Sequence, residues 1–178
     1  MTMRAFILSL CLVSLCVSSE VLAQSAAGIR WTAPAGWKVE GPRPMRAATY
    51  SIAVVPGDHG PAECVVNYFG PGLGGTVAAN VDRWRAQVLG ADGKPAVAAV
   101  TTRTFRGVKV TVVDSSGTYT GMGGPIASGA KPVSGYRLLG AIAEGPGGNV
   151  FFKLTGPSKT IAAQQAAFDR VLASIQPE

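Results

Sequence analysis

The residues best suited to chemistry in this sequence surround a turn in its first half. His59 is the only histidine, and Asp58 and Glu63 lie within four positions of it. An imidazole with two carboxylates can hold a metal ion, and an imidazole alone can act as a general base. The sequence has no second histidine to support such a site and no G-x-S-x-G nucleophile motif. These three residues are therefore metal-ligand candidates, and we assign no catalytic residue.

A glycine-rich segment at residues 70–75, GPGLGG, has the spacing of a dinucleotide-binding turn. In such a turn the glycines let backbone amides approach a pyrophosphate at the start of a helix. Pro71 removes one of those amides, and the next predicted strand ends in Thr104 and Phe105 without the acidic residue that would hold a ribose. We therefore predict a glycine-rich turn and no bound cofactor.

Residues 115–135 contain six glycines and two prolines and are predicted to form a long loop. Recognition groups gather on loops that a rigid scaffold holds in place. Tyr119 and Met122 lie in this segment, and Tyr136 and Arg137 follow it. These four residues are the binding candidates, and the alternative is a hairpin tip without a role.

Two amphipathic helices are expected to position these groups. The first shows apolar residues at helical spacing, follows Thr76 as N-cap and ends at Gly90. Its apolar stripe consists of Val77, Val81, Trp84 and Val88. The second helix follows the residues 156–158 and closes the chain. Its stripe consists of Ile161, Phe168, Val171, Leu172 and Ile175.

Alternating apolar residues predict seven strand segments, three before the first helix and four between the two helices. The strand segments lie within residues 29–39, 45–55, 62–69, 97–105, 108–114, 136–144 and 150–155. Short connections between neighbouring strands favour antiparallel hairpins. The sequence thus predicts an α+β fold, with a central antiparallel sheet of about six to seven strands flanked by two main helices. Residues 24–178 form a single domain.

The N-terminal segment has the three parts of a secretory signal peptide. Arg4 precedes an apolar run at residues 5–17, and Ala23 ends a stretch suited to cleavage, so residues 1–23 are the predicted signal. The run would rise only about 20 Å as a helix, against about 30 Å for a bilayer core, so no transmembrane segment is expected after cleavage. We expect a periplasmic or secreted protein. Cys64 would be its only cysteine, which leaves no partner for a disulfide.

The formal net charge of +6 favours acidic partners. The basic residues are scattered and form no stripe with interleaved aromatics, and an exported protein does not meet the cell's nucleic acid. The candidate partners are therefore an envelope protein or an anionic envelope component, with nucleic acid excluded.

Four segments together resemble a group of exported bacterial proteins of unknown function: WTAPAGW at residues 31–37, Met45 with Arg46, NVDRWRAQ at residues 80–87, and FFKLTGP at residues 151–157. The order of strands and helices is similar to the PsbP-like fold, also found in periplasmic DcrB-type proteins. The resemblance implies an antiparallel sheet sandwiched with helices and used for binding or assembly. We therefore expect an exported, non-enzymatic accessory domain that binds a ligand or a partner. The alternative is a small extracytoplasmic hydrolase or metal-dependent enzyme that uses His59.

Overall fold

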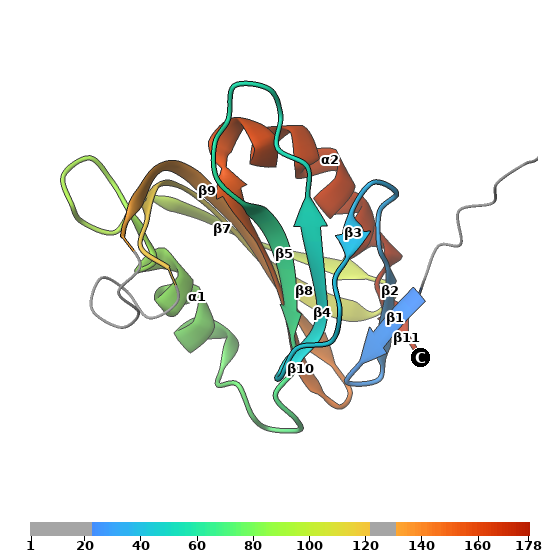
Figure 1. Ribbon diagram of the computed structural model, residues 1–178. Helices are drawn as coiled ribbons and strands as arrows, with labels where there is room; N and C mark the ends of the chain where they lie inside the picture. Colours follow the sequence, from blue (N-terminus) through green and yellow to red (C-terminus); the bar gives the residue numbers. More distant parts are fainter. Residues whose placement is uncertain (1–22, 122–130) are drawn as a thin grey trace, which may run out of the picture.

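The structure is a computed structural model that describes residues 23–121 and 131–178 (Figure 1). The predicted signal peptide therefore lies outside the described residues, except for Ala23. In chain order the elements are β1 (Ala23–Ala26), β2 (Ile29–Thr32), β3 (Lys38–Val39), β4 (Arg46–Ile52), β5 (Ala62–Asn67), α1 (Val77–Arg85), β6 (Val88–Leu89), β7 (Ala98–Phe105), β8 (Val108–Tyr119), β9 (Val133–Gly145), β10 (Gly148–Pro157), α2 (Ser158–Ser174) and β11 (Gln176–Pro177).

The strands form one large and one small sheet, and every pair is antiparallel. The large sheet has eight strands in the order β3-β4-β5-β10-β9-β8-β6, and β7 also pairs with β8. The small sheet has the order β1-β2-β11. The predicted α+β fold with an antiparallel sheet and two helices is confirmed. The large sheet exceeds the predicted six to seven strands, and the second small sheet makes the domain more than a simple sandwich.

The two helices lie on opposite faces of the large sheet (Figure 1). Neighbouring side chains of a strand point to opposite faces. In β10, Phe152 and Leu154 therefore join the core beneath α2, whereas Phe151 packs with Trp84 of α1. The side chain of Lys153, two positions beyond Phe151, lies on the α1 face as well. Alternate residues of β10 therefore contribute to two different cores, one beneath α1 and one beneath α2.

Helix α1 begins where the sequence predicts and ends earlier. The Thr76 hydroxyl accepts a hydrogen bond from the backbone N–H of Ala79, as expected of an N-cap. The helix ends at Arg85 instead of continuing toward Gly90, and Val88 enters β6. Val88 is still buried in the core beneath α1, so its apolar character extended the helical pattern past the true end.

The described part of residues 115–135 is largely sheet, which corrects the predicted loop. Strand β8 continues to Tyr119 and β9 starts at Val133, and these two residues are paired. Ser115 is likewise paired with Leu138. The tertiary pairing overrides the low strand propensity of the serines and glycines. Met122 lies outside the described residues.

Helix α2 is capped by a side chain from a distant loop. Its N-cap residue, Pro157, makes no side-chain hydrogen bond. The Asp58 carboxylate accepts hydrogen bonds from the Thr160 backbone N–H, at 2.7 Å, and from the Thr160 hydroxyl, at 2.8 Å. A carboxylate at this position also complements the positive end of the helix dipole.

We expect Asp58→Ala to lower the free energy of unfolding by about 1–2 kcal/mol, because it removes the cap of α2. Urea denaturation of the two proteins measures the difference. His59→Ala is the matched control, since the exposed His59 is next in sequence and should change stability by less than about 0.5 kcal/mol. Equal losses for the two variants would contradict the capping role.

Among the described residues, neither helix has the length and hydropathy needed to cross a bilayer.

Candidate functional site

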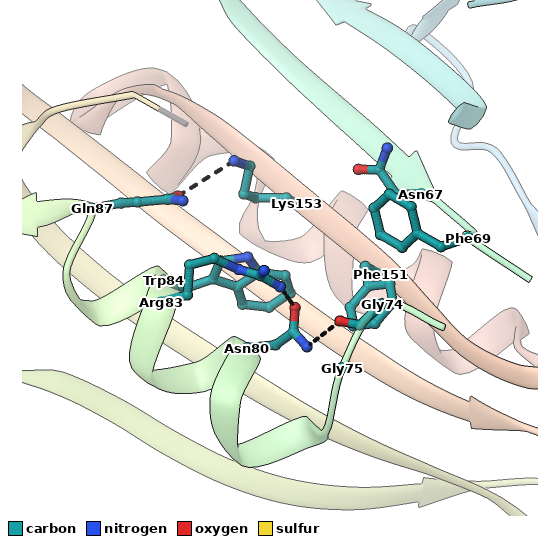
Figure 2. Close-up of a pocket in the computed structure, with 10 residues that line it drawn as sticks. All are labelled: Asn67, Phe69, Gly74, Gly75, Asn80, Arg83, Trp84, Gln87, Phe151 and Lys153. Carbon is teal, nitrogen blue, oxygen red and sulfur yellow. Dashed lines mark hydrogen bonds between the residues drawn. The ribbon is translucent and has the colours of Figure 1, made fainter. Parts of the chain in front are cut away.

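A pocket of about 480 Å³ opens on the α1 face of the sheet, between α1 and the strands β5 and β10 (Figure 2). Its size falls within the range of small-molecule sites. The lining combines aromatic rings with amides and two cations. It consists of Asn67, Phe69, Gly74, Gly75, Asn80, Arg83, Trp84, Gln87, Phe151 and Lys153.

The glycine-rich turn forms one wall of the pocket, and Asn80 fixes it to α1. Asn80 is only 1% exposed, and its Nδ2 donates 2.8 Å hydrogen bonds to the carbonyl oxygens of Gly74 and Thr76. Gly74 has a φ of 87°, and a Cβ there would lie 2.8 Å from the rings of Phe69 and Phe151. Backbone conformation and close packing against the two rings therefore account for the glycine at this position.

The apolar part of the pocket is a set of three rings. Phe69 and Phe151 pack at a tilted angle with centroids 5.7 Å apart, and Trp84 lies on the same face. Phe151 and Trp84 are buried, but Phe69 keeps 37% of its surface exposed at the rim. An exposed aromatic ring beside a cavity provides apolar surface that a ligand can cover.

Trp84 packs directly against the backbone of the sheet at Gly140. A Cβ at Gly140 of β9 would overlap the indole ring, so only glycine lets α1 approach this closely. Val81 and Trp84 then bury the apolar side of the helix against Val113, Leu138 and neighbouring residues. The close approach places the polar side of α1 along the pocket.

Lys153 is the most unusual group of the site. It is only 6% exposed, and its Nζ donates hydrogen bonds to the Tyr119 hydroxyl at 3.2 Å and to Gln87 Oε1 at 3.4 Å. The amine also lies 5.8 Å from the centre of the Tyr119 ring. Burial lowers the pKa of Lys153 to about 8, although the charge of Glu63 opposes this shift.

Neither cation of the pocket has an ion-pair partner within the described parts of the chain. Glu63 pairs with Arg46 instead, at 3.7 Å. Arg83 donates a hydrogen bond to Asn80 Oδ1 and otherwise stands exposed at the mouth of the pocket. The lining contains no acidic residue. The pocket therefore has an excess of positive charge with Arg83 at its mouth and Lys153 at its floor.

Two of the four predicted binding residues lie beside this site. Tyr119 contacts Lys153, and the Tyr119 and Tyr136 rings stack with centroids 6.1 Å apart. The Tyr136 hydroxyl donates a hydrogen bond to the Pro61 carbonyl oxygen at 3.3 Å. Burial raises the pKa of Tyr119 to about 12, so its hydroxyl stays protonated.

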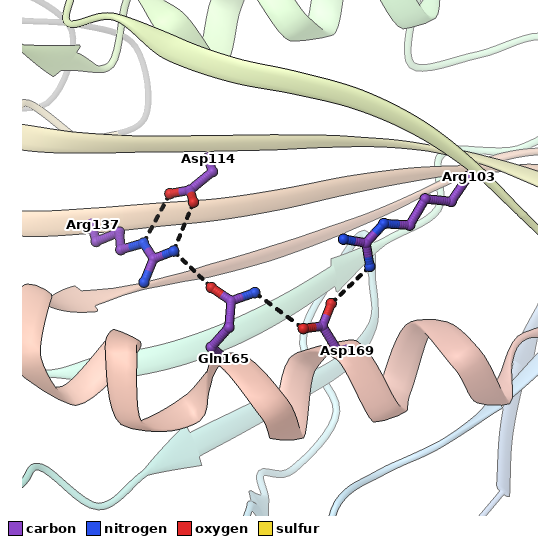
Figure 3. A network of polar contacts seen from close by, with 5 residues as sticks. All are labelled: Arg103, Asp114, Arg137, Gln165 and Asp169. Atoms are coloured by element: carbon purple, nitrogen blue, oxygen red, sulfur yellow. Dashed lines mark hydrogen bonds and ion pairs between the residues drawn. The ribbon is translucent and has the colours of Figure 1, made fainter.

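Arg137 lies on the opposite face of the sheet, beneath α2 (Figure 3). Its guanidinium binds the Asp114 carboxylate through two hydrogen bonds, of 2.8 and 2.7 Å, and Gln165 Oε1 through a third, of 2.6 Å. The hydrogen bond to Asp114 raises the pKa of Arg137. The contacts continue from Gln165 to Asp169 and on to Arg103. This network connects three strands to α2, so Arg137 has an evident structural role.

The three metal-ligand candidates are directed to different partners. Asp58 caps α2, Glu63 pairs with Arg46, and His59 is exposed. Over residues 23–121 and 131–178, no cluster of three or more potential ligands is present. The strand conformation of β5 turns Glu63 onto the sheet surface, whereas the preceding turn directs Asp58 toward α2.

Sequence reasoning did not single out Lys153, Arg83, Asn80 or Gln87 as site residues. One signal was available for Lys153, because it is a charged residue within the apolar segment FFKL of a predicted strand. Burying a lysine without an ionic partner is unfavourable, which makes such a residue a candidate for function. The other three lie off the apolar stripe of the first helix, and their role depends on what that side of the helix faces.

Comparison with known proteins gives structural neighbours only. No protein-family model and no curated protein matches the chain. The solution structure of cyanobacterial PsbP (CyanoP) from Synechocystis sp. PCC 6803 matches with 15% sequence identity and a TM-score of 0.52, over 95% of this chain and 99% of that one. The crystal structure of PA94 from Pseudomonas aeruginosa, a protein of unknown function and putative regulator, matches with 10% identity and a TM-score of 0.51, over 89% of this chain and 97% of that one. These likenesses over almost the whole chain show that it has a PsbP-like fold.

Proposed function

We propose that this protein is an exported, non-enzymatic accessory domain that binds a small organic molecule in the pocket beside α1. The observation that carries the proposal is the placement of the buried Lys153 amine at the floor of a ring-lined cavity. Largely apolar cavities with a few convergent polar groups are typical small-molecule sites. Residues 1–23 would direct the chain to the periplasm or the cell exterior.

The chemistry of the lining supports binding over catalysis. The side chains offer amide groups, a guanidinium, an amine and aromatic surface. Among the ten described lining residues only the Lys153 amine could act as a base or nucleophile, and none carries the carboxylate, imidazole, hydroxyl or thiol that hydrolytic sites usually use. The pocket is thus equipped to hold a ligand in one orientation.

The scaffold around the pocket supports the same function. Asn80 ties the glycine-rich turn to α1, and Trp84 fixes α1 against Gly140 of the sheet. A site whose walls are held this way is largely formed before its ligand arrives, which reduces the entropy lost on binding.

An NMR fragment screen of the mature protein tests the proposal. We expect a subset of small aromatic and polar fragments to shift the backbone amides of Gly74 and Asn80 and the indole N–H of Trp84. The amides of Thr101 and Thr102, on the exposed strand β7, are the internal control and should not move. A screen that leaves the pocket signals unchanged would refute the proposal. Hydrolytic turnover that His59→Ala abolishes would favour the enzymatic alternative.

A further inference from the structure

The charge of the pocket indicates which kind of molecule it receives. Lys153 is 6% exposed and has no ion-pair partner among the described residues. An ammonium group has three N–H donors, and two of them are used by Tyr119 and Gln87. One donor is left for a further acceptor, in a setting where a buried charge is costly unless it is paired.

A second cation lies on the way into the same cavity. Arg83 uses its guanidinium for a hydrogen bond to Asn80 Oδ1, and the group has five N–H donors in all. Arg83 is exposed and lines the pocket, so its remaining donors are accessible to a ligand. The Asn67 and Gln87 amides add neutral polar groups, and no acidic side chain lines the cavity to repel an anion.

The rest of the lining is suited to a flat apolar body. Phe151 is buried in the wall, and Phe69 exposes 37% of its surface at the rim. Their tilted rings, together with the indole of Trp84, present edges and faces on which another ring can pack. An apolar group here would cover the exposed part of Phe69 while leaving the polar end near Lys153.

We infer that the pocket binds a small monoanion that joins an aromatic body to a carboxylate or sulfonate, with the anionic group received by Lys153 and Arg83. This inference rests on the proposed function, because it names the ligand class of the same pocket. An anion would supply the missing partner of the buried amine, and charge-assisted hydrogen bonds are about twice as strong as neutral ones.

Isothermal titration calorimetry with 2-naphthoate and 2-naphthamide tests the inference. The two probes share their ring system and differ in the charge of the polar group. We expect 2-naphthoate to bind roughly ten-fold or more tightly at pH 7, because the amide lacks the charge that Lys153 and Arg83 would pair with.

Three variants test whether Lys153 and Arg83 cause the preference for 2-naphthoate. Lys153→Met and Arg83→Met should each weaken 2-naphthoate binding by roughly ten-fold and leave 2-naphthamide nearly unchanged. Lys153→Met removes a buried charge from the interior and should not prevent folding. Arg85→Met is the matched control, since Arg85 lies on the same helix, pairs with Asp82 and does not line the pocket. It removes the same charge and should change neither affinity.

The outcomes separate this inference from the proposed function. Equal affinities for the two probes would refute the preference for an anion and leave ligand binding intact. If neither probe binds but other fragments still shift the pocket signals in the NMR screen, the preference for an anion is again refuted and ligand binding stays intact. No binding by any fragment would refute both proposals. Equal weakening by Arg85→Met and Lys153→Met would show general attraction to a basic protein and would also refute the inference.

Discussion

Replacing Phe168 with alanine is expected to lower the free energy of unfolding by about 3–5 kcal/mol, the range observed when a large buried aromatic side chain is removed. Phe168 of α2 has no exposed surface and belongs to the main core, with Phe152 and Leu154 of β10. A close-packed core around a 17-residue helix cannot collapse freely into the space that the ring leaves. The loss is a large part of the total stability of a typical domain.

Urea denaturation followed by circular dichroism measures this loss. Arg170→Ala is the matched control because Arg170 lies on the same helix and is exposed. The control should change stability by no more than about 0.5 kcal/mol. A Phe168→Ala loss below about 1 kcal/mol would mean that α2 does not depend on this face for its packing.

Replacing Trp84 with alanine is expected to have a similar energetic cost, about 3–5 kcal/mol, and to destroy the pocket as well. Helix α1 has nine residues, too few to be stable without tertiary packing. Trp84 is 5% exposed and rests on Gly140, where no side chain separates the indole from the sheet. Without the ring, α1 loses most of its attachment, and Asn80 and Arg83 move with it.

Two measurements distinguish the parts of this prediction. Urea denaturation reports the lost stability, and hydrogen exchange should show faster exchange of the α1 amides than of the β9 and β10 amides. Arg85→Ala removes an exposed side chain from the same helix and should leave both measurements nearly unchanged. Unchanged protection of α1 in Trp84→Ala would show that other contacts hold the helix.

The helices were the most predictable part of the fold. All five residues of the predicted stripe of the second helix are buried, although Ile175 lies just past the end of α2, and Val81 and Trp84 of α1 are buried as well. Large apolar residues at helical spacing leave few alternative structures once one face must be buried. The end of α1 was predicted wrongly because Val88 keeps the apolar spacing but is buried in a strand.

The extent of β8 and β9 could not be predicted from local sequence. Serine and glycine are poor strand formers, and Ser115 and Gly117 would ordinarily indicate a loop. They lie in the sheet because Leu138 and Tyr136 pair with them. That pairing depends on the register of the whole hairpin, which the pattern of a single segment does not contain.

The site depended still more on long-range structure. The alternation in residues 151–154 predicts that Lys153 points away from Phe152 and Leu154, yet it does not reveal what covers that face. Only the sheet order places α1 over β10 and brings Arg83 to the same cavity. By the same principle, Arg137 and Tyr136 are adjacent in sequence but point to opposite faces, so one contributes to a structural network and the other lies beside the pocket.

The position of β10 in the middle of the sheet determines when the protein can fold. Strand β5 ends at Asn67 and pairs with β10, which begins only at Gly148. A chain that emerges from the ribosome with its N-terminus first cannot join these strands until residues 148–157 have emerged. Nearly the whole polypeptide must therefore be synthesised before β5 gains β10 as its second neighbour, so this long-range pairing forms late compared with the local pairs β3–β4 and β4–β5.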